Sequence, residues 1–99
     1  MMTQSDLVKM TKSNLQIAGE SWDEYLGQLI EAAREYIERQ GISLDLEAID
    51  DCNLVVMYAS YLYRKRVDND NPGMPRMLRY ELNNRLFAQK ISAARRGDG

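Results

Sequence analysis

The most apolar stretch of the chain is a run of ten residues, Leu54–Tyr63, that contains no charged side chain. Such a run suits either a buried strand or a buried helix, so its flanks and spacing must decide. Two acids, Asp50 and Asp51, precede the run and three bases follow it, which complements the dipole of a helix. Apolar or small residues recur at the three-and-four spacing of one helix face: Ile49, Cys52, Val56, Ala59 and Tyr63. The pattern therefore predicts a buried central helix.

This central helix is expected to begin at a cap, either Ser43 or Asp45, and to run to about Val67. Apolar side chains also point from its other faces, so the helix needs cover on nearly every side. A chain of 99 residues rarely covers a helix completely, and we expect a neighbouring subunit to complete the cover. The apolar run is too short for a membrane span, which needs about 20 apolar residues, and no signal segment is expected before it.

A second amphipathic helix is predicted between Ser21 and Gly41. Ser21 followed by Glu24 has the pattern of a capping box, and Gly41 suits the position that ends a helix. The apolar face of this helix is formed by Trp22, Leu26, Leu29, Ile30, Ala33 and Ile37. Acids dominate its opposite face. A helix of about 20 residues, roughly 30 Å long, is therefore expected here.

A last helix is predicted after residues 68–73, which consist of turn-forming residue types. Pro75 suits its first turn. Its inward positions are predicted to be Leu78, Leu82, Leu86 and Ile91, flanked by Met77, Tyr80 and Phe87. Near the start of the chain, Ser5–Asp6 is predicted to cap a short helix that ends near Asn14, followed by an extended connector at Leu15–Ile17. A flexible basic tail is expected from Ala93 onward.

Together these elements predict an all-α fold: a small antiparallel helical bundle of three main helices plus a short N-terminal helix. We expect a single domain over residues 1–96, with residues 97–99 as a disordered tail. Each main helix is expected to contribute one face to the core. The predicted core residues are Trp22, Leu26, Leu29, Ile30, Ile37, Cys52, Val56, Ala59, Leu62, Leu78, Leu82 and Leu86.

The composition leaves little room for catalysis. The chain has no histidine and one cysteine, so it lacks the commonest metal ligands and the Ser-His and Cys-His nucleophile pairs. Neighbouring residues on a helix point about 100° apart, so Asp50 and Asp51 favour a helix-start charge over a shared acid–base or metal site. Cys52, on the apolar face, is expected to be a buried thiol. We therefore predict no enzyme activity, no catalytic residue, no metal and no cofactor.

Charge is unevenly distributed along the chain, although the net charge is only −2. Residues 1–63 hold eleven acids and four bases, a balance of −7, whereas residues 64–99 hold four acids and nine bases, a balance of +5. Such asymmetry is typical of a nucleic-acid-facing half or of head-to-tail contact between like subunits. It also arises when two helices simply have different solvated faces.

The basic half offers a candidate surface for nucleic acid. Its bases include the run Arg64–Arg66 and three arginines further along: Arg76, Arg79 and Arg85. The same bases also suit a helix C-terminus, packing on tyrosines, or pairing with the acids of a neighbouring subunit. A pI near 5.1 argues against simple non-specific DNA binding. A small helical nucleic-acid-binding regulator that uses the basic half is the alternative function.

Two segments resemble the small head–tail connector proteins of long-tailed bacteriophages, also called head-completion or DNA-packaging adaptor proteins. The segments read LVVMYASYLYRKR at 54–66 and MPRMLRYELNNRLF at 74–87. The front half is similar too, with a short helix that leads to WDEYL at 22–26 and on to Gly41. These are packing patterns rather than catalytic signatures, so the resemblance transfers no active-site residue.

The resemblance implies a non-enzymatic structural protein of the virion. It implies a ring at the portal vertex that connects head to tail and extends the DNA channel. The implied partners are further copies of the chain, the portal protein, and the next head-completion or tail protein. DNA would pass without specific binding, and no membrane is involved. The implied location is the head–tail junction of the virion, with assembly in the host cytoplasm.

The charge split adds a prediction about contacts within such a ring. An acidic helix of one subunit can meet the basic half of the next, and this heterologous contact closes into a ring if the rotation permits. The predicted subunit interface consists of Glu31, Glu35, Glu38, Arg64, Arg66, Arg76, Arg79 and Arg85.

Overall fold

A computed structural model describes residues 3–67 and 73–96, and these residues form four α-helices and no strand. The helices are α1 (Gln4–Leu15), α2 (Asp23–Arg39), α3 (Ile49–Val67) and α4 (Arg76–Arg96). The predicted all-α class, with three long helices after a short one, is confirmed. No helix in the described part of the chain is long and apolar enough to cross a membrane. Residues 97–99, predicted to be a disordered tail, and most of the predicted turn at 68–73 lie outside the described residues.

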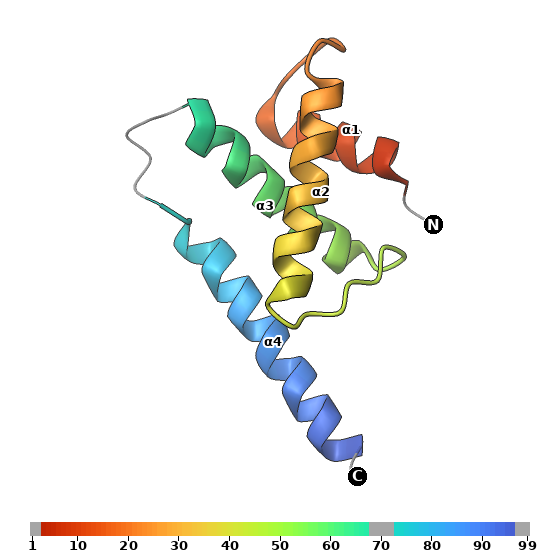
Figure 1. The fold of residues 1–99 in the computed structure, drawn as a ribbon, viewed down its shortest axis with the longest axis vertical. Coiled ribbons are helices and arrows are strands. Elements are labelled where there is room, and N and C mark those ends of the chain that lie inside the picture. The colour runs from red at the N-terminus through yellow and green to blue at the C-terminus, as the bar shows by residue number, and fades with distance from the viewer. Residues whose placement is uncertain (1–2, 68–72, 97–99) are drawn as a thin grey trace.

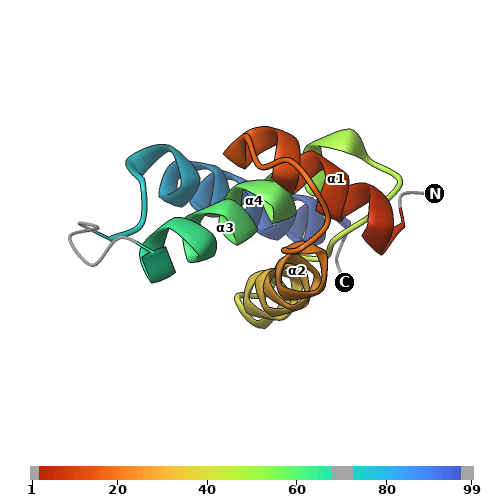
Figure 2. The same ribbon diagram turned by 90° about the horizontal axis from the view of Figure 1, so that it is seen from above.

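Helix α3 is the centre of the fold, because it contacts each of the other three helices. Helices α1, α2 and α3 pack against one another, whereas α4 lies beside α3 (Figures 1 and 2). In both views α3 and α4 run in opposite directions, and Figure 1 shows α2 crossing α3 obliquely. The C-terminal part of α4 extends beyond the other helices (Figure 1). An antiparallel arrangement of the whole bundle stays a prediction.

The start of α1 is fixed by a reciprocal cap that lies earlier in the chain than the predicted cap at Ser5–Asp6. Thr3 Oγ1 accepts the Asp6 N–H at 3.2 Å, and Asp6 Oδ2 accepts the Thr3 N–H at 3.1 Å. Thr3 is therefore the N-cap, and Asp6 is the third helical residue of a capping box rather than a cap. These two hydrogen bonds lower the pKa of Asp6, which is held in its charged form.

The end of α1 overturns the extended connector predicted at 15–17. The helix continues to Leu15, and Gln16 then adopts a left-handed conformation with φ 60° and ψ 42°. The Ile17 N–H donates to the Lys12 carbonyl at 2.9 Å, which closes the last turn. The alternating apolar pattern at these positions reflects a helix terminus, not a strand-like segment.

Helix α2 also begins differently from the prediction. The expected capping box of Ser21 and Glu24 is absent, since Trp22 occupies the N-cap position and makes no side-chain cap bond. The Leu26 N–H donates to the Trp22 carbonyl at 2.8 Å, so the helix starts one residue later than Ser21 would set it. At the other end Gly41 has φ +100°, as expected for a residue that ends a helix.

The other two helices have boundaries that shift for local reasons. Helix α3 starts at Ile49, because Asp45 instead opens a turn in which its Oδ1 accepts the Glu47 N–H at 3.0 Å. Helix α4 continues to Arg96, so the flexible tail predicted from Ala93 is wrong over its helical part. Pro75 directly precedes α4 and its carbonyl accepts the Arg79 N–H at 3.1 Å.

The core lies where α3 meets its three neighbours. Eight of the predicted core residues are buried, namely Leu26, Ile30, Ile37, Cys52, Val56, Ala59, Leu78 and Leu82. Three more are partly buried and pack against the core: Leu29, Leu62 and Leu86. Trp22 differs, because its side chain is 42% exposed. It precedes the helix, on the rim of the fold, where its ring meets those of Tyr25 and Tyr63 at centroid distances of 5.9 and 5.8 Å.

Candidate functional site

The outer side of α2 forms an acidic face. Its members Glu31, Glu35 and Glu38 are all exposed, and the helix periodicity brings them to one side. Arg39 reaches back to Glu35 with an N–O distance of 3.4 Å. This pair is exposed on both partners, so water and salt screen it and it adds little to stability. The acidic face is therefore available for contact with a positively charged surface.

The C-terminal end of α3 carries the bases at 64–66, all exposed and all in contact with other residues of the same chain. The contacts are Arg64 Nη2 to Asn14 Oδ1 at 3.5 Å, Lys65 Nζ to the Tyr61 ring centroid at 5.9 Å, and Arg66 Cζ to the Tyr25 ring centroid at 5.8 Å. Cations in this position also complement the negative end of the helix dipole. These bases thus stabilise the end of α3 through contacts with their own chain, in addition to any contact with phosphate or another subunit.

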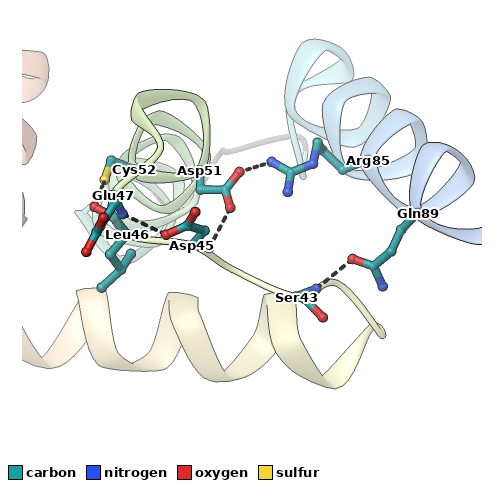
Figure 3. A network of polar contacts seen from close by, with 8 residues as sticks. All are labelled: Ser43, Asp45, Leu46, Glu47, Asp51, Cys52, Arg85 and Gln89. Atoms are coloured by element: carbon teal, nitrogen blue, oxygen red, sulfur yellow. Dashed lines mark hydrogen bonds and ion pairs between the residues drawn. The ribbon is translucent and has the colours of Figure 1, made fainter. Parts of the chain in front are cut away.

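The predicted interface arginines of α4 fall into two groups. Arg76 and Arg79 are exposed near its start. Arg85 instead points toward α3, where its Nη1 pairs with Oδ1 of Asp51 (Figure 3). Its side chain keeps 30% exposure, whereas that of Asp51 keeps 6%. Arg85 therefore joins two helices of one chain.

Asp51 lies in the first turn of α3, as predicted for a helix-start charge, and it also has a second role. Its Oδ2 accepts the Asp45 N–H at 2.6 Å, while Oδ1 pairs with Arg85 (Figure 3). A buried carboxylate needs such partners, because removal from water strongly disfavours an unpaired charge. Asp51 thereby connects the segment before α3 to α4.

Gln89 lies one helical turn after Arg85 and completes the connection. Its Oε1 accepts the Ser43 N–H at 2.8 Å (Figure 3). Its Nε2 donates to the Gly41 carbonyl. Residues four apart share one side of a helix, so Arg85 and Gln89 act together. We call this network the α4 clasp: the side chains of Asp51, Arg85 and Gln89 with the backbone of Gly41, Ser43 and Asp45. The α4 clasp sets the position of α4 against the body of the fold.

Cys52, the single cysteine of the chain, is buried. Cys52 Sγ donates to the Leu46 carbonyl at 3.2 Å, and burial, aided by the carboxylates of Asp51 and Asp45, raises the pKa of the thiol. A raised pKa keeps the thiol protonated and therefore a poor nucleophile. Within residues 3–67 and 73–96 there is no group of three or more His, Cys, Asp or Glu side chains that could hold a metal ion.

The described residues thus form a small helical protein with an acidic face on α2 and exposed bases at the end of α3 and the start of α4. A family model described as "Phage gp6-like head-tail connector protein" matches residues 5–91. The match spans most of the chain, and the chain therefore belongs to this family of phage head–tail connectors. No curated protein and no solved structure matches the chain.

Family membership confirms the resemblance seen in the sequence. It gives the chain a structural, non-enzymatic role in joining the head and tail of a phage, in contact with other head and tail proteins, and a place in the virion.

The α4 clasp was not predicted from the sequence. The available signal was that Arg85 and Gln89 lie on the same side of the last helix as Leu78 and Leu82, where apolar residues are expected. Two polar residues on a buried face indicate that partners exist. The identity of those partners depends on how the segment before α3 folds back, which periodicity does not reveal.

Proposed function

We propose that copies of this chain assemble into a ring at the portal vertex, which connects the phage head to the tail and extends the DNA channel. The proposed partners are other copies of the chain, the portal protein, and the next head-completion or tail protein. The family match supports the connector role. The observation that supports a ring is the separation of exposed charge: acids on the outer side of α2 and bases at the end of α3 and the start of α4.

The charge separation favours a head-to-tail contact between copies. Two identical acidic faces repel each other, whereas an acidic face attracts the basic surface of another copy. A contact between unlike surfaces is heterologous, and it generates a closed ring when the rotation permits. We propose that Glu31, Glu35 and Glu38 of one copy face Arg64, Arg66, Arg76 and Arg79 of the next. Arg85 takes part less directly, because the α4 clasp already neutralises it.

DNA is proposed to pass through the ring without specific binding. The chain carries a net charge of −2, and the bases at 64–66 contact residues of their own chain. A regulator that binds duplex DNA through several phosphates would lose affinity by orders of magnitude as salt rises. A gel shift at low salt measures this directly. A strong, salt-sensitive shift would favour the alternative of a nucleic-acid-binding regulator over a channel protein.

The decisive test of the connector function is binding to capsids that carry a portal. Purified protein should be incubated with such capsids and the particles imaged by electron microscopy. We expect extra density at the portal vertex alone. Capsids assembled without portal protein provide the control. Absence of added density at the portal end would exclude the proposed location.

A charge-reversal variant tests the ring contact itself. Glu31→Lys, Glu35→Lys and Glu38→Lys together should block ring formation on portal-bearing capsids while far-UV circular dichroism stays unchanged, because all three residues are exposed. The matched control reverses two exposed acids outside α2, Glu20→Lys and Glu47→Lys, and should still assemble. If the α2 variant assembles as well as wild type, the acidic-to-basic contact is wrong.

A further inference from the structure

Helix α4 has a second apolar side that the described residues of the chain leave exposed. Leu78 and Leu82 are buried against the body of the fold, yet four other large apolar side chains of this helix are exposed. They are Met77 at 70%, Tyr80 at 63%, Phe87 at 65% and Ile91 at 39%. Together with Asn84 they are spaced alternately three and four residues apart, which places them on one stripe roughly opposite the buried leucines. We call this the outer stripe of α4.

A groove between α3 and α4 offers an apolar floor for such a stripe. It consists of two adjoining hollows, of about 360 and about 270 Å³, and Met57 lines both. Leu54 adds to the apolar lining of the larger hollow, and Leu78 to that of the smaller. Asp50 and Glu81 add carboxylates at the larger hollow, where Arg85, already paired with Asp51, is also in the lining. Arg64 lines the smaller hollow. The groove thus combines apolar area with two carboxylates at one end and a base at the other.

The smaller hollow also contains an unsatisfied polar group. Ser60 is 1% exposed, and within the described part of the chain its hydroxyl has no hydrogen-bond partner. A buried hydroxyl without a partner is costly, because it has lost its hydrogen bonds to water. Ser60 is among the residues that line the hollow, but its hydroxyl oxygen has almost no accessible surface and lies beneath that lining.

Charge decides which surface of a second copy fits the groove. Helix α4 contains six bases and a single acid, so pairing of two outer stripes with each other would bring like charges together. Phe87 and Ile91 lie on the side of α4 opposite the clasp residues, with Lys90 between them in the sequence, and the C-terminal part of the helix extends past the other helices (Figure 1). A helix side that combines apolar residues with a base complements a groove with apolar lining and two carboxylates at its larger hollow.

We propose that Asn84–Ile91 of one copy docks into the α3–α4 groove of the next copy. Phe87 and Ile91 cover Met57 and Leu54, and Lys90 approaches the carboxylates of Asp50 and Glu81. Asn84, one turn before Phe87, lies over the smaller hollow. The docking proposal rests on the proposed function in one respect, because it takes a second copy of the chain as the partner. It adds a surface distinct from the acidic face of α2.

Cysteine cross-linking of two different variants tests which surfaces meet. Phe87→Cys and Asn53→Cys each place a thiol at an exposed position, one on the outer stripe and one at the rim of the groove. The native Cys52 is buried, so it interferes little. In a concentrated mixture under mild oxidation, we expect a cross-linked dimer that contains one copy of each variant. Neither variant alone should cross-link efficiently.

Two outcomes of this experiment overturn the docking proposal. Efficient dimers of Phe87→Cys alone mean that outer stripes meet each other. No mixed dimer, either in concentrated solution or on portal-bearing capsids, means that the stripe does not enter the groove. Capsid binding without the mixed dimer removes the docking proposal and leaves the connector function intact. A mixed dimer without capsid binding supports the docking proposal and excludes the proposed connector location.

An affinity measurement provides an independent check with a matched control. Phe87→Ser should weaken self-association in sedimentation equilibrium by about tenfold or more, as expected when an aromatic anchor is lost. Tyr80→Ser changes an aromatic residue of similar exposure on the same stripe, but outside Asn84–Ile91, and should leave association near wild type. Lys90→Glu should also weaken association, and combining it with Asp50→Lys should restore it. Equal effects of the Phe87 and Tyr80 variants, or no rescue, would overturn the proposed register.

Discussion

Replacing Arg85 with methionine removes the positive partner of a carboxylate that is almost completely buried. Asp51 is only 4% exposed, and among the described residues its carboxylate then keeps the hydrogen bond from the Asp45 N–H. Breaking a fully buried ion pair from one side costs about 3–5 kcal/mol. Water reaches the Arg85 side chain, which is 30% exposed, so we expect a smaller loss of about 2 kcal/mol in the free energy of unfolding. For a chain of this length that corresponds to a melting temperature lower by roughly 8–16 °C.

Two optical probes can show where this loss occurs. Trp22 is the single tryptophan, and its ring contacts Tyr25 of α2 and Tyr63 of α3, so its fluorescence reports the α2–α3 packing. Far-UV circular dichroism reports all four helices. Because the clasp fixes α4, the Arg85→Met variant should lose helical signal at lower urea concentration than it loses the native fluorescence. In wild type the two transitions should lie closer together.

Two further variants make the interpretation specific. Lys90→Met removes an exposed charge from the same helix and should change stability by less than about 0.5 kcal/mol. Asp51→Asn combined with Arg85→Met removes both charges, so it should be more stable than Arg85→Met alone. If Arg85→Met unfolds like Lys90→Met, or if the double variant is no better than the single one, the ion pair does not hold α4 in place.

Three other predictions concern single sites. Gly41→Ala forces an L side chain into φ +100° and should lower stability by about 1 kcal/mol or more in urea unfolding, with no matching loss in a variant at an ordinary helical position. Burial, with the nearby Tyr36 and Tyr61, raises the pKa of Tyr58 to about 12. Because the same phenol ionises near pH 10 in the unfolded chain, it stabilises the fold below pH 10, and this contribution is lost as the pH rises toward 12. Tyr58→Phe should therefore reduce the alkaline decline of the urea midpoint. Cys52 should react with a thiol reagent only as fast as the protein opens, so its labelling rate should rise with the unfolding transition in urea.

The existence and order of the helices follow from periodicity, but their first residues do not. The sequence offered Ser5, Asp6 and Ser21 as caps, all of suitable residue type. The structure uses Thr3 instead, and Trp22 holds the N-cap position of α2 without a side-chain bond. A cap requires a particular backbone conformation at the point where the chain enters the helix, and that point is set by tertiary packing.

Burial was predictable where a residue lies inside a helix on its apolar face, as with Leu26 and Ile30. Trp22 fits the same periodicity but precedes the helix, so its side chain stays at the rim. The α4 clasp is harder still to predict from the sequence. Asp51 and Arg85 are 34 residues apart, and nothing in their local patterns couples them. The candidate surfaces could be proposed from the sequence because they depend on charge and exposure. The network that positions them depends on long-range geometry.

The clasp also has a consequence for the order in which a newly made chain matures. Helices α1, α2 and α3 contact one another and precede α4 in the sequence, so they can associate before α4 has been synthesised. The clasp contacts of Gly41, Ser43 and Asp51 form only when Arg85 and Gln89 are in place. Because these contacts join residues far apart in the sequence, we expect them to form late. The groove between α3 and α4 is complete only after that step. A partly synthesised chain consequently cannot offer the groove to another subunit, and this delay separates folding from assembly.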